Sequence, residues 1–320
     1  MILIDSFNKS IIFVSSFVFT LVFTYIITKI SFSKNIVGRD VHKPWISYAS
    51  SIGGTAFIIG VLIPLILHPG PKTLVLVSSS LLALIIGFID DLRRLSAIRK
   101  TLLSIIPGIP IIVMDQYYPS PYIPFIGEAK LHLLYPIFVL VGYAVALNAV
   151  NMSDTHNGLI SGVLLIFFSS ITPLIKDYET QIIILSIIAS LSAFLIYNSY
   201  PAKSFVGNSG SYILGSWVAL IAFMERLEYL TILSLFPLVI NGFSIIVSVG
   251  GLKERGEIST RPVKVVNGFI YGNKDPRAPI TLANIASLKK PLRETEFVIA
   301  VYILVLISTL LSIILFYKND

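Results

Sequence analysis

Long apolar stretches alternate with short polar ones along the whole chain. Ten apolar stretches reach or approach the roughly 20 residues that a helix needs to cross a bilayer. They occupy residues 11–31, 49–67, 74–89, 102–114, 133–147, 159–175, 182–197, 212–224, 230–249 and 297–316. The pattern predicts an all-α polytopic membrane protein with about ten transmembrane helices, built as one integral-membrane domain over residues 1–320.

The composition supports this prediction and excludes several classes of protein. The 320 residues are 55% hydrophobic and only 13% charged, which is too apolar for a soluble domain. The first ten residues, MILIDSFNKS, lack the basic segment and cleavage site of a secretory signal, so we expect the first apolar stretch to remain as a span. The absence of cysteine excludes disulfides, thiolate zinc sites and cysteine nucleophiles.

The basic residues predict the orientation in the membrane. The net charge of +7 comes mostly from short loops beside apolar stretches, so we expect the partner to be the lipid bilayer and not nucleic acid. Counted in alternate loops, lysine and arginine number seventeen on one side and six on the other, with Lys29 left out. Basic loops face the cytoplasm, so both termini are expected on the outer side and the long segment of about 250–296 in the cytoplasm.

The same alternation brings five polar motifs to the cytoplasmic side. They are GRDVHKP (38–44), DDLRRLSAIRK (90–100), NAVNMSDTHNG (148–158), YNSYPAKSFVGNSG (197–210) and the segment 250–296. Their convergence predicts one site on that face. The outer segment 115–130, rich in tyrosine and proline, is typical of an interfacial turn or a small hairpin.

The acidic pair Asp90 and Asp91 ends the third apolar stretch. A basic cluster follows it: Arg93, Arg94, Arg99 and Lys100. The pair can simply end a helix beside basic residues, and taken alone this interpretation is as good as a functional one. However, adjacent carboxylates repel each other unless a proton or a cation relieves them. Magnesium, which prefers oxygen ligands and phosphate, is such a cation.

The motif NAVNMSDTHNGL offers oxygen ligands between two apolar stretches. Asn148 and Asn151 stand at helical spacing, where their amides need partners at the end of a span. Asp154 adds a carboxylate, whereas Asn157 and the following glycine are typical of a turn. A lone histidine such as His156 is more often a hydrogen-bonding residue than a metal ligand.

Two further segments have both a functional and a structural interpretation. FVGNSGSYILG (205–215) begins a helix whose backbone N–H groups can receive a phosphate, but such glycine-rich runs also serve as joints between spans. The late polar segment offers cations that suit a diphosphate or merely follow the orientation rule. They are Arg261, Lys264, Lys274 and Arg277.

Together these motifs, with PITLANIASLKKPLRE before the last span, resemble those of the polyprenyl-phosphate N-acetylhexosamine-1-phosphate transferases. Within that family the chain is similar to the dolichyl-phosphate N-acetylglucosamine-phosphotransferases of eukaryotes and archaea. The resemblance implies ten spans, a cytoplasmic active site and, for a prokaryote, the plasma membrane. It implies transfer of N-acetylglucosamine 1-phosphate from UDP-N-acetylglucosamine to dolichyl or another polyprenyl phosphate, with release of UMP, as in the first membrane step of N-glycosylation. It also implies Mg²⁺, with Mn²⁺ as an alternative, and a homodimer is a further expectation.

The resemblance also implies roles for individual residues. Asp90 and Asp91 correspond to the acidic pair beside the metal and the lipid phosphate, and Lys100 to a lysine on the diphosphate. Asn151 corresponds to a magnesium ligand. Contacts to the nucleotide sugar are implied for Asn148, Asn157 and Asn198, and a contact to the diphosphate for Arg261. We also expect Lys43, Asp154 and Lys264 to bind substrate.

Two positions depart from the family pattern. Asn208 stands where the family has an aspartate that binds magnesium, so one negative charge is lost and we expect weaker metal binding. Asp154, placed as in the bacterial cell-wall branch, is a candidate to compensate, and the alternative is an altered or weakly active protein. The late segment GEISTRPVKVV replaces a motif rich in histidine or arginine, which leaves the sugar contacts open.

The sequence leaves three alternatives open, which concern the substrate, the mechanism and the class of protein. The same reaction with another UDP-N-acetylhexosamine or another polyprenyl acceptor fits the motifs, and so does a two-step route through an aspartyl-phosphate. A secondary transporter is the competing class, but its polar residues are expected at the middle of the bilayer and in paired inverted halves.

Overall fold

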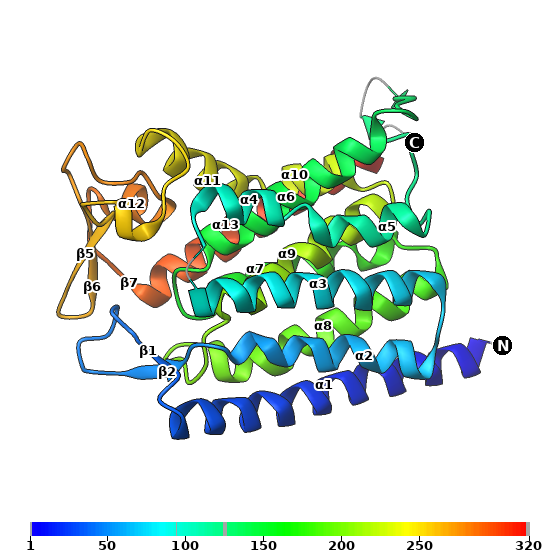
Figure 1. Ribbon diagram of the computed structural model, residues 1–320, viewed down its shortest axis with the longest axis horizontal. Helices are drawn as coiled ribbons and strands as arrows, with labels where there is room; N and C mark the ends of the chain where they lie inside the picture. Colours follow the sequence, from blue (N-terminus) through cyan, green and yellow to red (C-terminus); the bar gives the residue numbers. More distant parts are fainter. Residues whose placement is uncertain (1, 94, 124–126, 318–320) are drawn as a thin grey trace.

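The computed structural model describes residues 2–93, 95–123 and 127–317 (Figure 1). Arg94 and Lys318, two of the basic loop residues, lie outside these ranges. The longer helices are α1 (Ile2–Ser33), α2 (Phe57–Leu67), α3 (Pro71–Arg93), α6 (Tyr135–Ser153), α7 (Leu159–Ile171), α8 (Tyr178–Asn198), α9 (Gly207–Met224), α11 (Phe236–Ser248) and α13 (Glu294–Tyr317). The shorter ones are α4 (Ala97–Leu103), α5 (Ile109–Val113), α10 (Glu228–Ser234) and α12 (Leu282–Ser287).

Five of the described helices are long and apolar enough to cross a membrane, and six if the bent pair α10 and α11 forms one span. The two helices of that pair meet at 70°. Each of the ten predicted stretches contains helix, but length and composition support fewer crossings than ten. The polytopic class is therefore confirmed, whereas the number of spans and their orientation stay predictions.

The fourth predicted stretch, residues 102–114, is not one helix. α4 ends at Leu103, a 3₁₀ turn follows at Ile106–Gly108, and α5 covers only Ile109–Val113. Pro107 and Pro110 explain the break, because proline has no N–H to donate and clashes with the preceding turn.

The all-α prediction omits three small antiparallel sheets. β1 (Val37–Arg39) pairs with β2 (Tyr48–Ser50), and β3 (Tyr122–Ile123) pairs with β4 (Gly127–Glu128). The second pair is the small hairpin expected between residues 115 and 130. In the long polar segment, β5 (Val263–Val266), β6 (Phe269–Gly272) and β7 (Leu292–Arg293) form a three-stranded sheet with Val263 opposite Gly272 and Ile270 opposite Leu292.

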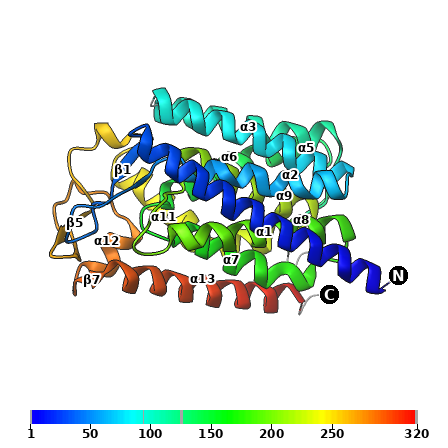
Figure 2. The same cartoon turned by 90° about the horizontal axis from the view of Figure 1, so that it is seen from below.

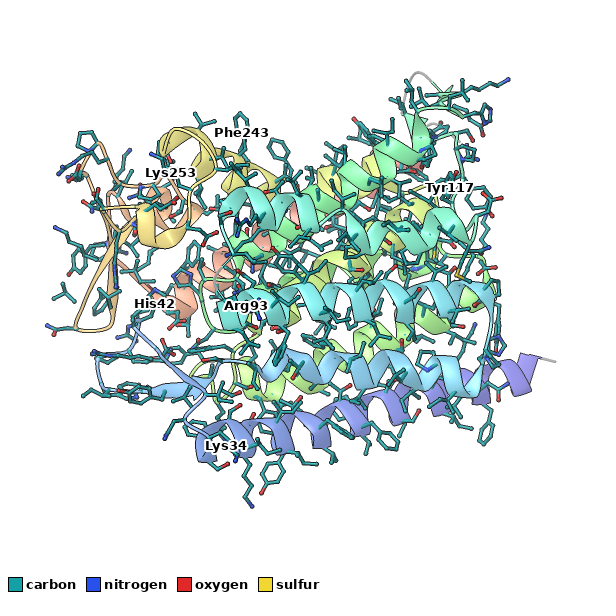
Figure 3. All side chains as sticks on the ribbon, viewed as in Figure 1. Lys34, His42, Arg93, Tyr117, Phe243 and Lys253 are labelled. Carbon is teal, nitrogen blue, oxygen red and sulfur yellow. The ribbon has the colours of Figure 1, made fainter. Side chains whose placement is uncertain are left out.

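The loops gather at one end of the helix bundle. Figures 1 and 2 both show β1, β5, β7 and α12 at this end, and the free ends of α1 and α13 at the other. We call the first the polar end, defined by residues 38–50, 90–93, 95–100, 148–158, 197–210 and 250–293. Among the labelled side chains of Figure 3, His42, Arg93 and Lys253 lie there, whereas Tyr117 lies at the opposite end.

Helix α9 runs through the core of the bundle. Every residue from Ser209 to Met224 is buried, against α3 on one side and α6 on the other. Small residues allow the close approach, as is common between membrane helices. A Cβ added to Gly87 would lie 2.5 Å from Ser209 Cα, and one added to Gly215 would lie 2.5 Å from Leu147 Cα. α9 is therefore held between two backbones.

We expect Gly215→Ala to destabilise the protein, because the new methyl group meets the backbone of α6, which cannot rotate away. Overpacking of this kind costs about 1–3 kcal/mol. The measurement is the Tm of the detergent-solubilised protein, with Gly256→Ala as the matched control, since a Cβ at Gly256 has no neighbour within 4 Å. Equal Tm values for both variants would show that α6 and α9 are not closely packed at Gly215.

Candidate active site

The carboxyl end of α3 meets the amino end of α9 at Asp91. The Asp91 carboxylate accepts hydrogen bonds from the backbone N–H of Asn208 (3.3 Å) and of Ser209 (3.2 Å), and from Ser209 Oγ (2.7 Å). The first turn of a helix has N–H groups without partners in that helix and favours negative charge. Asp91 therefore caps α9, a helix more than a hundred residues away in sequence.

Asp90 is buried and has its own partners. Lys100 Nζ lies 2.9 Å from Asp90 Oδ2, and the backbone N–H of Leu95 donates to Asp90 Oδ1 at 2.9 Å. Lys100 and the amino end of α9 thus offset part of the repulsion between Asp90 and Asp91 within the protein.

Lys100 joins this site to the long polar segment. Its ammonium lies between Asp90 and Glu254, whose Oε2 is 3.1 Å away, and its side chain is 16% exposed. Glu254 follows α11 and was not among the predicted site residues, because one acidic residue among basic ones in a loop has no distinctive sequence signal. A phosphate that binds Lys100 must therefore compete with a carboxylate.

Two asparagines bring α6 to the same place. Asn151 Nδ2 donates to Asn208 Oδ1 (2.9 Å) and to Ser211 Oγ (2.8 Å). One turn earlier, Asn148 Nδ2 donates to Ser104 Oγ, next to α4, at 3.1 Å. The end of α6 is thus attached to both α4 and α9. Within the part of the chain that the structure describes, Asn151 Oδ1 has no hydrogen-bond donor.

These groups fit a hard divalent cation. Asn151, Asn208 and Asp91 supply amide and carboxylate oxygens from three helix ends that are in direct hydrogen-bond contact. Oxygen ligands of this kind suit Mg²⁺, which keeps several of its waters and needs only one or two carboxylates. The amide of Asn208 contributes no charge, so Asp91 supplies the negative charge of this group.

A second polar cluster lies at the same end, around Lys43. Lys43 Nζ is 3.0 Å from Asp40 Oδ2 and 2.7 Å from Glu294 Oε2, and it stands 3.7 Å from the ring centre of Tyr200. Asn157 completes the cluster through its side chain, which donates to Asp40 Oδ2 at 2.8 Å. Lys43, predicted to bind substrate, is placed in a buried ion pair, and its partners Asp40 and Glu294 were not predicted.

The charge states within this cluster follow from its contacts. Burial alone raises the pKa of Asp40, but the hydrogen bond from Asn157 and the nearby Lys43 ammonium lower it below its usual value. Burial, with Lys43 and His42 nearby, keeps the pKa of His156 well below its usual value, so His156 is neutral. Its ring stacks on His42 at 4.3 Å, and its Nδ1 forms a hydrogen bond with Thr155 Oγ1.

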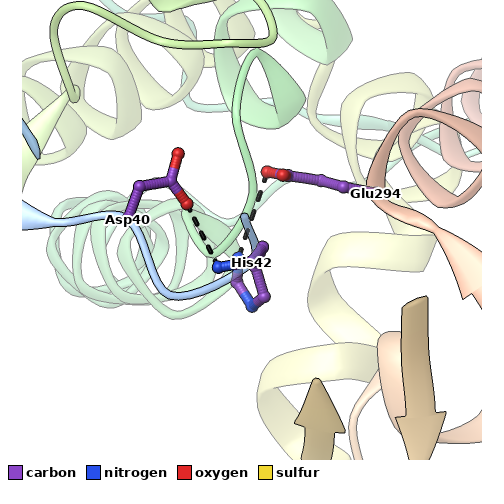
Figure 4. Close-up of side chains that lie close together, drawn as sticks. All are labelled: Asp40, His42 and Glu294. Atoms are coloured by element: carbon purple, nitrogen blue, oxygen red, sulfur yellow. Dashed lines mark hydrogen bonds and ion pairs between the residues drawn. The ribbon is translucent and has the colours of Figure 1, made fainter. Parts of the chain in front are cut away.

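Asp40, His42 and Glu294 also place three ligand atoms within 4.8 Å of one another (Figure 4). Such a group can hold a metal ion in principle. Here the Lys43 ammonium, in contact with both carboxylates, already supplies the positive charge. The cluster is therefore complete as an ion-pair network.

The side chains of the other predicted residues take part in neither cluster. Asp154 follows α6 directly, and burial raises its pKa to about 7, so it is ionised fully only above neutral pH. Asn198 is buried, accepts from Ser161 Oγ and donates to the Ser204 carbonyl at 2.9 Å, which fixes the loop after α8. Arg261 precedes β5 and Lys264 lies within it. Both are exposed, and among the described residues they form no ion pair with either cluster.

Comparison with known proteins identifies a family for the central part of the chain. Residues 73–225 match the family described as glycosyl transferase family 4, and this segment contains Asp90, Asp91, Lys100, Asn151 and Asn208. Asp40, Lys43 and Glu294 lie outside it.

Individual relatives include proteins of archaea and of bacteria. The chain is 33% identical over 197 residues to a putative UDP-N-acetylglucosamine–dolichyl-phosphate N-acetylglucosaminephosphotransferase of Saccharolobus solfataricus. The aligned region covers 58% of this chain and 61% of that relative. It is 30% identical over 252 residues to a phospho-N-acetylmuramoyl-pentapeptide-transferase of Clostridium novyi, over 72% of this chain and 77% of the relative. A phospho-N-acetylmuramoyl-pentapeptide-transferase of Lactobacillus acidophilus is 30% identical over 272 residues, which cover 76% of this chain and 84% of the relative. The chain belongs to glycosyl transferase family 4, as the resemblance of its motifs predicts.

Proposed function

We propose that this protein transfers N-acetylglucosamine 1-phosphate from UDP-N-acetylglucosamine to dolichyl or another polyprenyl phosphate and releases UMP. The observation that carries the proposal is the meeting of Asp91, Asn151, Asn208 and Lys100 at one end of an apolar bundle. This arrangement suits a reaction between a water-soluble diphosphate and a lipid phosphate. The names of the archaeal relatives supply the donor and the acceptor.

A divalent cation, Mg²⁺ or Mn²⁺, is part of the proposal. Asn151, Asn208 and Asp91 would hold it, and when bound it neutralises phosphate charge and polarises the phosphorus that is attacked. The site thus combines one carboxylate with two amides, whereas the family pattern has an aspartate in place of Asn208. We therefore expect a substitution of Asn208 to change metal affinity more than any other property.

The protein's own residues account for the remaining requirements of the transfer. An oxygen of the lipid phosphate attacks the sugar-bearing phosphorus, and the bond to the bridging oxygen breaks as UMP leaves with the electron pair. Lys100 exchanges Glu254 for a diphosphate oxygen and compensates the charge that grows on the leaving group. Asp90 holds Lys100 in position through its ion pair.

Direct transfer is favoured over a two-step route through an aspartyl-phosphate. The Asp91 carboxylate accepts three hydrogen bonds and Asp90 is paired with Lys100, so the oxygens of both carboxylates are engaged and are less available to attack phosphorus. The acceptor phosphate is already anionic, so the reaction needs no strong base.

We further propose that the polar end faces the cytoplasm, where nucleotide sugars are made, and that in a prokaryote the membrane is the plasma membrane. The basic loops support this orientation. A second candidate is transfer from another UDP-N-acetylhexosamine, which the phospho-N-acetylmuramoyl-pentapeptide-transferases among the relatives support. A transporter is disfavoured because the polar residues gather at one end of the bundle.

Asp91→Asn is expected to lower kcat for transfer by about 100-fold or more, because the amide carries no charge and one of its two oxygens is replaced by a donor. The measurement is the formation of lipid-linked N-acetylglucosamine from labelled nucleotide sugar by purified protein. Arg93→Ala, at an exposed position two residues away, is the matched control and should retain activity. Activity close to that of the unaltered protein in Asp91→Asn would remove Asp91 from the site.

Asn208→Asp is expected to lower the Mg²⁺ concentration for half-maximal activity, because a carboxylate replaces an amide in the metal group while Asn151 Nδ2 keeps its acceptor. A Mg²⁺ titration of the transfer rate measures it, with Asn35→Asp as a control that adds the same charge at an exposed position. An unchanged half-saturation in Asn208→Asp would place the metal elsewhere.

Glu254→Gln is expected to lower KM for the nucleotide sugar several-fold with little change in kcat, since Lys100 loses the carboxylate that competes with the diphosphate. Steady-state kinetics at saturating lipid phosphate measure the effect. Glu128→Gln, which removes an exposed carboxylate near Arg226, serves as the control. A raised KM in Glu254→Gln would instead make Glu254 a substrate-binding residue.

A further inference from the structure

Two segments that are distant in sequence meet at the buried Lys43 cluster. Asp40 and Lys43 belong to the loop between β1 and β2, and Glu294 begins α13. Their side chains are nearly inaccessible to solvent, at 2%, 0% and 1% exposure. Figure 4 shows Asp40 and Glu294 approaching the same point from opposite sides, with His42 beside them.

Asn157 attaches the loop between α6 and α7 to this cluster. The backbone N–H of Asn157 donates to Glu294 Oε1 and its side-chain amide donates to Asp40 Oδ2, both at 2.8 Å. The next residue, Gly158, has φ of 76° and ends the loop at the start of α7. Its carbonyl accepts from the Tyr302 hydroxyl at 2.5 Å. Helix α13 therefore fixes the loop through Glu294 and again through Tyr302.

The loop begins where the candidate metal ligands are. Asp154 follows the last residue of α6, and its backbone N–H donates to the Asn151 carbonyl at 3.3 Å. Only Asp154, Thr155 and His156 separate the end of α6 from Asn157. A displacement of Asn157 is thus transmitted over a few residues to the turn that carries Asn151.

We propose that Glu294 is a positioning residue for the transfer reaction, which acts by fixing the 154–158 loop and thereby the direction of Asn151 and Asp154. The inference rests on the proposed function for its effect on catalysis. Glu294 touches neither the candidate metal group nor Lys100. Its two oxygens are used in full, one by Asn157 N–H and the other by Lys43 Nζ.

The charges favour a positioning role over a purely stabilising one. Burial of two carboxylates and an ammonium is costly, and a well-packed apolar cluster often stabilises a protein as well or better. The charged groups instead fix one arrangement of the loops, because the Lys43 ammonium can only donate hydrogen bonds and the two carboxylates can only accept them. Lys43 also faces Tyr200 in the loop after α8, so the cluster sets the relative positions of three loops.

The test compares Glu294→Ala with Glu294→Gln and Glu296→Ala in the full chain. The glutamine keeps an acceptor for Asn157 N–H, and Glu296 is an exposed residue in the same helical turn. Loss of a group that orients a metal ligand typically weakens metal binding about 10–100-fold. We expect such a rise in the Mg²⁺ concentration for half-maximal transfer in Glu294→Ala, a small rise in Glu294→Gln and none in Glu296→Ala. The Mg²⁺ concentration for half-maximal transfer does not depend on how much of each preparation is folded.

A second readout needs no activity. Mn²⁺ binding, followed by electron paramagnetic resonance without substrate, should weaken in Glu294→Ala, and amide hydrogen exchange of residues 154–160 should accelerate. Faster exchange with unchanged Mn²⁺ affinity and unchanged Mg²⁺ half-saturation would overturn the proposal and leave Glu294 with a structural role only. If the unaltered protein fails to catalyse transfer, the proposed function fails, whereas Mn²⁺ affinity and hydrogen exchange still decide whether Glu294 positions the metal group.

Discussion

The contact between Asp91 and the first turn of α9 determines how the polar end is built. Helix α9 lies in the centre of the bundle, and the N–H groups of its first turn have no acceptor within the helix itself. The Asp91 carboxylate satisfies two of them, and Gly87 allows α3 to come close enough. Once α3 and α9 are joined in this way, Asn208 faces Asn151 of α6, and the three helix ends form one site.

The same constraint explains two groups of charged residues that lie next to the apolar core at this end. Asp90, Lys100 and Glu254 form one group, and Asp40, Lys43 and Glu294 form another. Charges next to an apolar core persist only when they are paired. A substrate phosphate therefore enters by exchange with Glu254, and the second group remains intact and supports the loop beside the site.

The sequence predicts the helices better than it predicts the partners of their side chains. Apolar length locates the helices, and the spacing of Asn148 and Asn151 indicates that both project from one end of α6. The acidic pair suggested an external cation, because its internal partners, Lys100 and the amino end of α9, are set by folding. Lys43 was assigned to substrate for a similar reason: its partner Glu294 lies 251 residues away, and no local pattern reveals such a contact.

Direct, metal-dependent transfer is tested by measuring both products with purified protein. UDP-N-acetylglucosamine is incubated with and without polyprenyl phosphate and Mg²⁺, and UMP and lipid-linked sugar phosphate are measured. We expect the two products to appear in equal amounts, and only when lipid and metal are both present. UMP released in amounts equal to the enzyme without lipid would contradict direct transfer, and absence of both products under every condition would contradict the proposed function.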